Sequence, residues 1–462
     1  MDWFQSIAAD VDAGQFRLIL RGELRQCEVE DPIVFQGVAH IDQNAQGGLA
    51  LRFVCESASG PFDVDAGLSD PPQGKAIAEH FHFDLEGIAS DARKWTAKRI
   101  QVRLDRRLKG WGPLSKPDGF DVALGEIPEL TTQHSTTIDE SARSHVAWII
   151  KGELRSPRQW QPKAWVHEDR EGVAWSIDHN RQGNTEVRFH AAADGFDSTS
   201  RYFFRAVSLL VGEPLQPICS ATIIDGVERF SITSLRRQGQ PQSILWIPPK
   251  FKSGWELFLI AWMAAESPGD SRKMEADGRV IQDVIYHYWY RLHKAYAVDI
   301  ENGAQVLTSS IEGMAKRYFS NVPAPFVTER EQEFRLTRAA LEQLDRKKHA
   351  RTINILRGKI DEEERKIYQD VQKRPDIDLL LDSLCHTKHI TGQMVKAWGN
   401  LRNDAAHGDH LVKGSDDIQK FERDFFQCFE AFKRLCMFAI DYDGPAQDFS
   451  VEGWPVLRNT AR

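Results

Sequence analysis

The chain has 462 residues, of which 41% are hydrophobic and 27% are charged, and its formal net charge is −8. This balance excludes a disordered chain, and the negative charge excludes nucleic-acid binding through an overall positive field. Neither the first 250 residues nor the remainder has an excess of Lys and Arg, so any contact with nucleic acid requires a local basic patch.

The sequence predicts a cytoplasmic protein that has no contact with a membrane. Its N-terminal segment lacks the basic start and apolar run of a signal peptide. The most apolar stretch, residues 255–265, is too short to span a bilayer. The six cysteines form no CxxC pair, and we expect them to be reduced thiols.

Residues 1–248 have the pattern of a β-rich region. Short runs rich in β-branched and aromatic residues alternate with turn residues. Turn-rich loops are expected at 68–74 and 112–119. The clearest strand-like runs are FRLILRGEL (16–24), GLALRFVCES (48–57), SHVAWIIKGEL (144–154), GVAWSIDH (172–179) and TEVRFHAAA (185–193).

One internal echo suggests a repeat. LILRGELR at 18–25 resembles WIIKGELR at 148–155, about 130 residues later. A duplicated β-sandwich-like module would explain the echo, with sub-modules at 1–140 and 141–248. A chance resemblance between two edge strands would explain it equally well.

The hydrophobic period changes near WIPPKFKSG, residues 246–254. Two prolines end the strand pattern, and Ser253 is a candidate N-cap for the apolar run that follows. We therefore expect an α+β multidomain protein with an all-helical region at 250–442 and a C-terminal tail at 443–462, which packs back through Trp454. The predicted helices are 254–266, 278–298, 303–319, 326–348, 350–372, 376–387, 390–407 and 415–440.

The stretch NLRNDAAHGDH, residues 400–410, concentrates polar side chains near the end of a predicted helix. Helical geometry places Asn403 and His407 on one face, with Arg402 beside them, and directs this face away from the apolar stripe. Gly408 is a suitable residue to follow the helix end. The apolar stripe consists of Met394, Val395, Trp398, Leu401 and Ala405. A solvated surface is the simplest explanation of the polar face, because a protonated His is favourable near a helix C-terminus.

The segment LRNDAAHG, with Arg402, Asn403 and His407 in the spacing Arg-polar-x-x-x-His, resembles the signature of HEPN domains, an all-helical family. The HEPN-like part would cover about residues 300–442. A β-rich region ahead of such a domain is similar to the ApeA-like proteins of bacterial anti-phage defence.

This resemblance implies a metal-independent endoribonuclease with no cofactor. Arg402, Asn403 and His407 would be catalytic, and RNA, with tRNA as the expected species, would be the substrate. His titrates near neutral pH and can move a proton, whereas Arg can bind phosphate oxygens. The family pairs two such domains, so we expect a homodimer or a higher homo-oligomer through the helical domain. The implied role is abortive infection. Residues 1–248 would then be a sensory or regulatory region, with a phage protein as the trigger.

Two other classes of function stay open. A non-catalytic HEPN module that binds a nucleotide, RNA or a partner would also use an outward Arg-Asn-His face. Alternatively, a β-sandwich that binds carbohydrate or peptide, joined to a helical dimerisation domain, would give His407 no role.

Further candidate sites have weaker patterns. A basic excess near 334–351, together with His410, predicts secondary RNA contacts at Arg346, Lys347, Lys348, Arg351 and His410. A solvated amphipathic helix of mixed charge explains the basic excess equally well. The aromatic run 285–296 could stack on bases through Tyr286, Trp289, Tyr290 and His293, although a buried helix or a dimer seam is the simpler explanation. The cluster at Cys385, His386 and His389 matches no common zinc spacing, so we expect no metal site.

Overall fold

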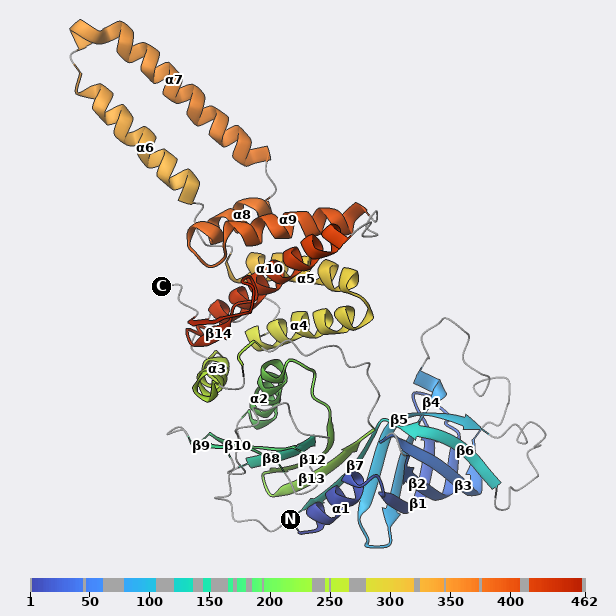
Figure 1. The fold of residues 1–462 in the computed structure, drawn as a ribbon. Helices are drawn as coiled ribbons and strands as arrows, with labels where there is room; N and C mark the ends of the chain where they lie inside the picture. Colours follow the sequence, from blue (N-terminus) through green and yellow to red (C-terminus); the bar gives the residue numbers. More distant parts are fainter. Residues whose placement is uncertain are drawn as a thin grey trace. The chain divides into compact units, whose positions relative to one another are not determined.

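The computed structural model describes most of the chain and shows a mixed α+β protein (Figure 1). The chain forms two compact units: Met1–Phe204 with Leu215–Gly239, and Arg205–Pro214 with Gln240–Arg462. The described residues are 2–44, 47–60, 79–104, 120–135, 144–150, 165–168, 173–179, 185–192, 195–234, 246–248, 251–265, 280–319, 325–344, 346–373, 376–407 and 415–458. The loops predicted at 68–74 and 112–119 lie outside these residues.

A closed antiparallel barrel forms the first part of the N-terminal unit. The strand order is β4-β1-β2-β3-β6-β5, and β5 pairs with β4 to close the ring. Closure leaves these strands without a free edge. The structure therefore has a barrel where the sequence suggested a sandwich-like module. Its strands are β1 (Arg17–Gln26), β2 (Val34–Gln43), β3 (Leu49–Ser59), β4 (His82–Ala89), β5 (Lys94–Leu104) and β6 (Phe120–Ile127).

Alternating burial along the strands fills the barrel with apolar side chains. In β3, for example, Leu51, Phe53 and Cys55 are buried, whereas the residues between them are more accessible. Burial raises the pKa of the Cys55 thiol to about 11, so this cysteine stays a neutral core residue.

A row of glycines marks a tight part of the barrel. Gly22 of β1 lies opposite Gly37 of β2 and Gly87 of β4. A Cβ atom at Gly22 would fall against the backbone of Glu86, so the adjacent strand leaves no room for a side chain there. This glycine begins the GELR segment that is identical in the two echo sequences, at 22–25 and 152–155.

The sheet continues beyond the barrel as an open antiparallel extension. β7 pairs with β5, and the order then runs β7-β13-β12-β8-β11-β10-β9. Of the second echo segment, residues 148–150 lie in β8, and 151–155 lie outside the described residues. β1 lies between β2 and β4, whereas β8 lies between β11 and β12, so these two strands have different neighbours. The strands are β7 (Glu129–Ser135), β8 (Ser144–Ile150), β9 (Trp165–Glu168), β10 (Ala174–His179), β11 (Thr185–Ala191), β12 (Pro217–Ile224) and β13 (Val227–Thr233).

In the described part of residues 1–248, which the sequence predicted as β-rich, the structure has two helices. They are α1 (Asp2–Asp12) and α2 (Phe196–Val211), and a short 3-10 turn covers Glu79–Phe81. The ring of Phe203 in α2 stacks on Phe189 of β11 with 4.8 Å between ring centroids. The sequence of α2 is rich in aromatic residues and Val, which are typical of strands, and this composition hides its helical period.

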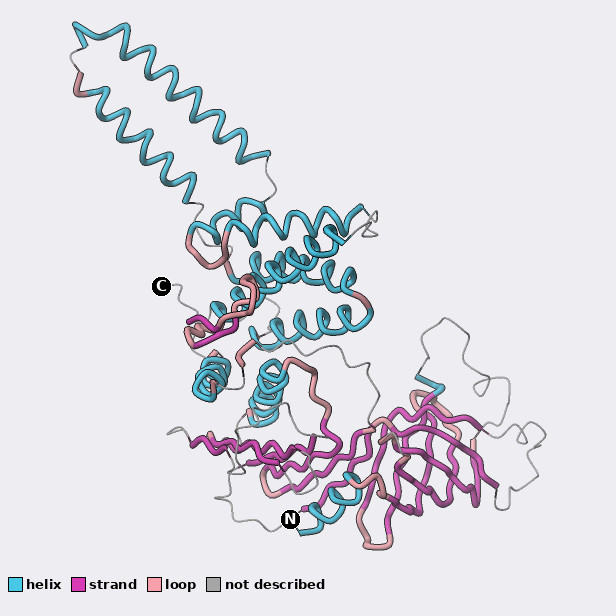
Figure 2. Tube along the Cα trace, in the orientation of Figure 1, coloured by secondary structure: helices cyan, strands magenta, loops and turns pink. Residues whose placement is uncertain are grey.

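The eight helices predicted in the C-terminal region are present, most of them with closely similar bounds (Figure 2). The largest difference is in the helix predicted at 326–348, which ends at Glu342, and the next helix begins at Arg346. They are α3 (Lys252–Ala264), α4 (Ile281–Val298), α5 (Ile300–Tyr318), α6 (Pro325–Glu342), α7 (Arg346–Lys373), α8 (Asp376–His386), α9 (Gly392–His407) and α10 (Ser415–Ala439). No helix in the described part of the chain is long and apolar enough to cross a membrane.

The N-cap predicted at Ser253 is wrong. α3 begins at Lys252, and Phe251 occupies the cap position without a side-chain hydrogen bond. The backbone already turns at this point, because Phe251 N donates to Pro248 O at 2.9 Å and Gly254 N donates to Phe251 O at 2.9 Å. Backbone hydrogen bonds therefore take the place of a side-chain cap at the start of α3.

Helix α5 lies at the centre of the helical bundle, where it contacts α4, α9 and α10. Phe425, Cys428, Phe432 and Leu435 of α10 are buried, as their spacing predicts, whereas Ile418 is 48% exposed. The tail forms a small pair of strands, β14 (Pro445–Gln447) and β15 (Val456–Arg458).

The tail packs on α10 through Trp454, as expected. Its ring lies 5.2 Å from that of Phe426 and 5.3 Å from that of Phe449. This contact anchors a segment that has little secondary structure of its own.

Helices α6 and α7 run side by side as a two-helix hairpin (Figure 1). A narrow seam of buried side chains, including Phe334, Leu341 and Ile353, joins them. Arg338 of α6 adds ion pairs to Asp361 at 2.8 Å and Glu364 at 2.5 Å on α7.

Candidate functional site

Helix α9 is anchored firmly in the bundle. Met394, Trp398 and Leu401 are at most 4% exposed, as the apolar stripe predicts. The indole Nε1 of Trp398 donates a hydrogen bond to the backbone oxygen of Thr308 in α5 at 3.1 Å. On the other side, Asn400 Nδ2 donates to Asp424 Oδ2 in α10 at 2.9 Å. Two neighbouring helices therefore fix both the position and the rotation of α9.

This rotation directs Arg402 and Asn403 outward. Both residues are exposed, whereas the preceding Leu401 is buried. The orientation is the one that helical geometry predicts from the sequence. The candidate site therefore lies on an accessible face of a rigid helix, which is a favourable support for a binding or catalytic group.

The guanidinium of Arg402 is oriented by two weak contacts. It lies over the ring of Trp398, with 4.9 Å from Cζ to the ring centroid. Its Nη2 atom is 3.8 Å from Oε2 of Glu312 on α5, and the Arg402 side chain is 45% exposed. Glu312 makes a closer ion pair with Lys316, at 2.6 Å. The Trp398 ring thus holds the guanidinium in place. The N–H groups of the guanidinium can still bind an anion, such as a phosphate, at a shorter distance than Glu312.

His407 is the last residue of α9, four positions after Asn403. Residues four apart on a helix lie on the same side, so the backbone brings His407 to the face of Asn403. The side chain of His407 lies outside the described residues, as do those of Ala405 and Ala406. Gly408 lies wholly outside them.

The secondary RNA contacts predicted near the start of α7 are not brought to this face by a described contact. Arg351 is exposed on α7, in the hairpin with α6. The side chains of Arg346, Lys347 and Lys348 lie outside the described residues, although their backbone begins α7. His410 also lies outside the described residues.

The segment around Cys385 has structural contacts. The ring of His389 packs against Phe319 and Phe438, with centroid distances of 5.3 and 4.8 Å, and its Nδ1 hydrogen bonds with Thr387 Oγ1 at 2.7 Å. Burial lowers the pKa of His389, which favours its neutral form. Among the described residues, no three His, Cys, Asp or Glu side chains are grouped so that they could hold a metal ion.

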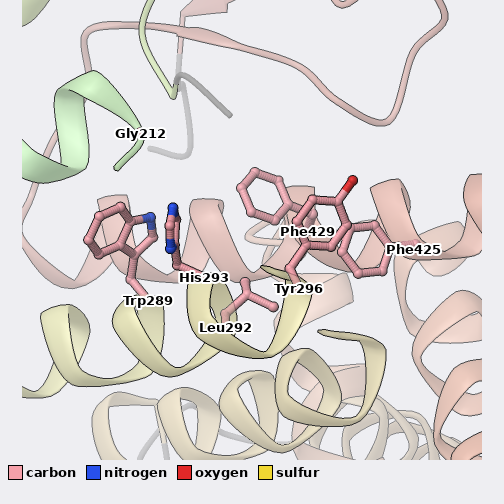
Figure 3. A pocket seen from close by; sticks show the side chains of 7 residues that line it. All are labelled: Gly212, Trp289, Leu292, His293, Tyr296, Phe425 and Phe429. Carbon is pink, nitrogen blue, oxygen red and sulfur yellow. The ribbon is translucent and has the colours of Figure 1, made fainter. Parts of the chain in front are cut away.

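The aromatic segment in α4 has two different faces. Trp289 is only 3% exposed and lines a small cavity of about 20 Å³ with His293, Tyr296 and Phe425 (Figure 3). This volume accepts about one water molecule and no substrate. Nε2 of His293 has no hydrogen-bond partner among the described atoms, and burial lowers the His293 pKa to about 4. The inner face of α4 is therefore core, as its apolar character suggests.

The outer face of α4 borders an open groove of about 620 Å³ against α5. Arg291 and Lys294 of α4 line this groove, and neither was among the residues predicted from the sequence. Their spacing with His287 places all three on one helical face. This spacing, set against the buried positions of the same helix, was the signal that could have revealed them.

The contact between Arg402 and Glu312 was also missed, because it joins residues 90 positions apart and no local pattern reports it. Arg402 on α9 and the cations of the groove beside α5 are therefore accessible groups that could bind an anionic ligand.

Comparison of the chain with protein-family models, with curated proteins and with solved structures finds no match.

Proposed function

We propose that the helical unit is a metal-independent endoribonuclease of the HEPN type. The observation that carries the proposal is the exposed pair Arg402 and Asn403 on a firmly anchored helix, one turn before His407. A merely solvated face needs no such anchoring by Trp398 and Asn400. It also does not explain an exposed guanidinium that is oriented by an aromatic ring.

The chemistry follows from the three residue types. In RNA, the ribose 2′-OH attacks the adjacent phosphorus, and the bond to the 5′ oxygen of the next nucleotide breaks. His407 would move a proton at the 2′ or 5′ oxygen, and Arg402 would stabilise the charge that develops on the phosphate oxygens. Asn403 would orient the imidazole or donate to the phosphate. The products are a 2′,3′-cyclic phosphate and a 5′-OH end, and DNA is not cleaved because it lacks the nucleophile.

A second subunit would complete the acid and base pair. One His can accept a proton or donate one, but the reaction needs both steps. A two-fold dimer would place two copies of Arg402, Asn403 and His407 around one cleft. The outward direction of Arg402 and Asn403 leaves them accessible to such a partner.

We further propose that this activity acts in anti-phage defence by abortive infection, with tRNA as the substrate. Because a ribonuclease is toxic to its own cell, it must be inactive until a signal arrives. The β-rich unit would supply that control by recognising a phage protein and by biasing the cleft between two states.

The test compares Arg402→Ala and His407→Ala with the matched surface variants Arg365→Ala and His386→Ala, which change exposed residues of α7 and α8 outside the predicted RNA contacts. RNA ends are sequenced from phage-infected cells and from reactions of tRNA with protein purified from infected cells, in the presence of EDTA. We expect the wild type and both control variants to produce 5′-OH ends. Each site variant should lose at least about a hundredfold in cleavage rate.

Three results would contradict the proposal. Cleavage by Arg402→Ala and His407→Ala at the control rate would exclude the site. A wild type that binds RNA but does not cut it under any infection condition would favour the non-catalytic binding module. Loss of cleavage in EDTA, restored by a divalent cation, would exclude the metal-independent chemistry.

A further inference from the structure

The open groove between α4 and α5 has the composition of a site for an anionic chain. His287, Tyr290, Arg291 and Lys294 line one wall, and Asn302 and Gln305 are part of the other. We propose that this groove binds the phosphate backbone of single-stranded RNA and leads the strand to Arg402. The inference rests on the proposed ribonuclease function and names the surface that would hold the substrate beside the cleavage site.

Charge is the first reason. Arg291 and Lys294 are exposed, and neither forms an ion pair within the described part of the chain. None of the described side chains that line the groove is acidic. Asp299, at the turn between the two helices, accepts hydrogen bonds from the backbone and side-chain amides of Asn302. The two cations are therefore available to phosphates, whose neutralisation drives nucleic-acid binding.

The position of Lys294 is the second reason. Its Nζ atom lies 4.6 Å from the centroid of the Tyr290 ring. A cation over an aromatic face is held without neutralisation of its charge, so the ammonium stays at the groove and can still bind a phosphate. Tyr290 in turn stacks on Tyr286, with 6.0 Å between centroids, and this stacking supports the ring from behind.

The two helices that form the groove pack directly against each other. At Gly303 an added Cβ would lie 3.4 Å from the Cα atom of Tyr296, and at Gly313 the hydroxyl end of Tyr288 fills the space that a side chain would take. A groove that is formed before the ligand binds loses less conformational entropy when a strand enters it.

The direction of the groove is the third reason. On α5, Gln305 and Glu312 are seven residues apart, which places them on one face about 10.5 Å from each other along the axis. Gln305 lines the groove, and Glu312 is the residue that contacts Arg402. The groove and the candidate cleavage site therefore open along the same side of one helix, close enough for a strand of a few nucleotides to occupy both.

The test uses the full chain with the double variant Arg291→Gln/Lys294→Gln. The matched control, Lys359→Gln/Lys366→Gln, removes two exposed lysines from α7. The probe is a short fluorescent single-stranded RNA with 2′-O-methyl riboses, which cannot be cut because the nucleophile is blocked. Its affinity is measured by fluorescence anisotropy over a range of salt concentrations. Loss of two phosphate contacts should reduce the slope of log affinity against log salt by about 1.4 in the groove variant, and the control should keep the wild-type slope.

Cleavage of unmodified RNA separates this inference from the proposed function. We expect the groove variant to have a raised KM and an unchanged kcat, since the variant keeps Arg402 and His407. If the groove variant matches the control in both binding and KM while the wild type cuts RNA, the groove is not the RNA path although the enzyme stands. If the groove variant binds RNA more weakly but the wild type does not cut it, the groove stands and the proposed function fails. If the wild type binds an acidic peptide and the groove variant loses this binding but keeps its affinity for RNA, the inference is overturned in favour of a protein partner.

Discussion

Two charged regions of the helical unit differ in how their charges are held. Near the end of α10, Glu430 and Lys433 have side chains only 2% exposed, at a distance of 2.7 Å from each other. Arg434 bridges Glu430 at 2.7 Å and Asp448 at 3.1 Å. On α9, by contrast, Arg402 is 45% exposed, and its ion pair with Glu312 spans 3.8 Å.

Each group of the α10 cluster has a structural partner. Lys433 also donates to the backbone oxygen of Gln447 and lies 5.1 Å from the ring of Phe449. Glu430 Oε2 accepts from the backbone amide of Phe449 at 3.0 Å. These bonds attach the C-terminal segment to α10, and they leave no capacity for a ligand. Arg402 on α9 can still bind a ligand. The number and closeness of the partners of a charged group therefore distinguish a structural cluster from a candidate site within the helical unit.

The largest effect should come from breaking the α10 cluster. Glu430→Ala leaves the ammonium of Lys433 buried without its carboxylate, and we expect the free energy of unfolding to fall by about 3–5 kcal/mol. Urea denaturation measures this loss. The double variant Glu430→Leu/Lys433→Met removes both charges together and should be clearly more stable than Glu430→Ala. Equal losses in the two variants would mean that packing, and not the unpaired charge, dominates.

His293 provides an intermediate case, because it is substantially buried but its Nε2 has no hydrogen-bond partner among the described atoms. Its folded pKa of about 4 lies below the ordinary value of 6.5, so the unfolded chain binds more protons between these values. The free energy of unfolding therefore includes the full contribution of neutral His293 above pH 6.5. This contribution is lost as the pH falls towards 4. We expect Tm to fall less between pH 7 and pH 5 in His293→Leu than in the wild type. The same fall in both proteins would show that His293 does not contribute to the acid sensitivity.

Local sequence patterns predicted the helical unit better than the β-rich unit. A helix is set by residues three and four positions apart, so α3 to α10 could be placed from their apolar periods. Closure of the barrel depends on pairing between β4 and β5 and between β3 and β6, and side-chain alternation does not specify which strands meet. Helix α2 was missed because its aromatic and Val residues follow the composition of a strand.

In the candidate site, too, local patterns predicted the orientation of side chains, but they did not predict the contacts between helices. The outward direction of Arg402 and Asn403 follows from the period of α9, and the structure confirms it. Glu312 and the groove beside α5 depend on how α4, α5 and α9 pack together, which no single helix specifies. Catalysis by Arg402, Asn403 and His407 stays a prediction that the experiments above can test.

A smaller effect on stability is expected at α9. Arg402→Met keeps an apolar chain over Trp398 and loses only a long, exposed ion pair, so the free energy of unfolding should change by less than about 1 kcal/mol. RNA cleavage should nevertheless be lost, since methionine cannot bind phosphate oxygens. Urea denaturation and cleavage assays of the same preparation compare the two effects. A loss of stability as large as that of Glu430→Ala would show that Arg402, like the charges of the α10 cluster, serves the structure.

The smallest expected effect is at Glu312, and it is the one that decides what the long ion pair to Arg402 does. If Glu312 only competes with phosphate for the guanidinium, Glu312→Gln removes a negative charge beside the RNA and should tighten binding. An exposed pair contributes about 0.2–1 kcal/mol, so the gain should be about 1.4- to 5-fold in affinity for the 2′-O-methyl RNA. Glu362→Gln is the matched control, because Glu362 forms the same i,i+4 pair with a lysine, Lys366, at 2.7 Å on α7. Tighter binding in Glu312→Gln alone would show that Arg402 is released to the substrate, whereas weaker binding would show that Glu312 positions Arg402 and that even this exposed pair is structural.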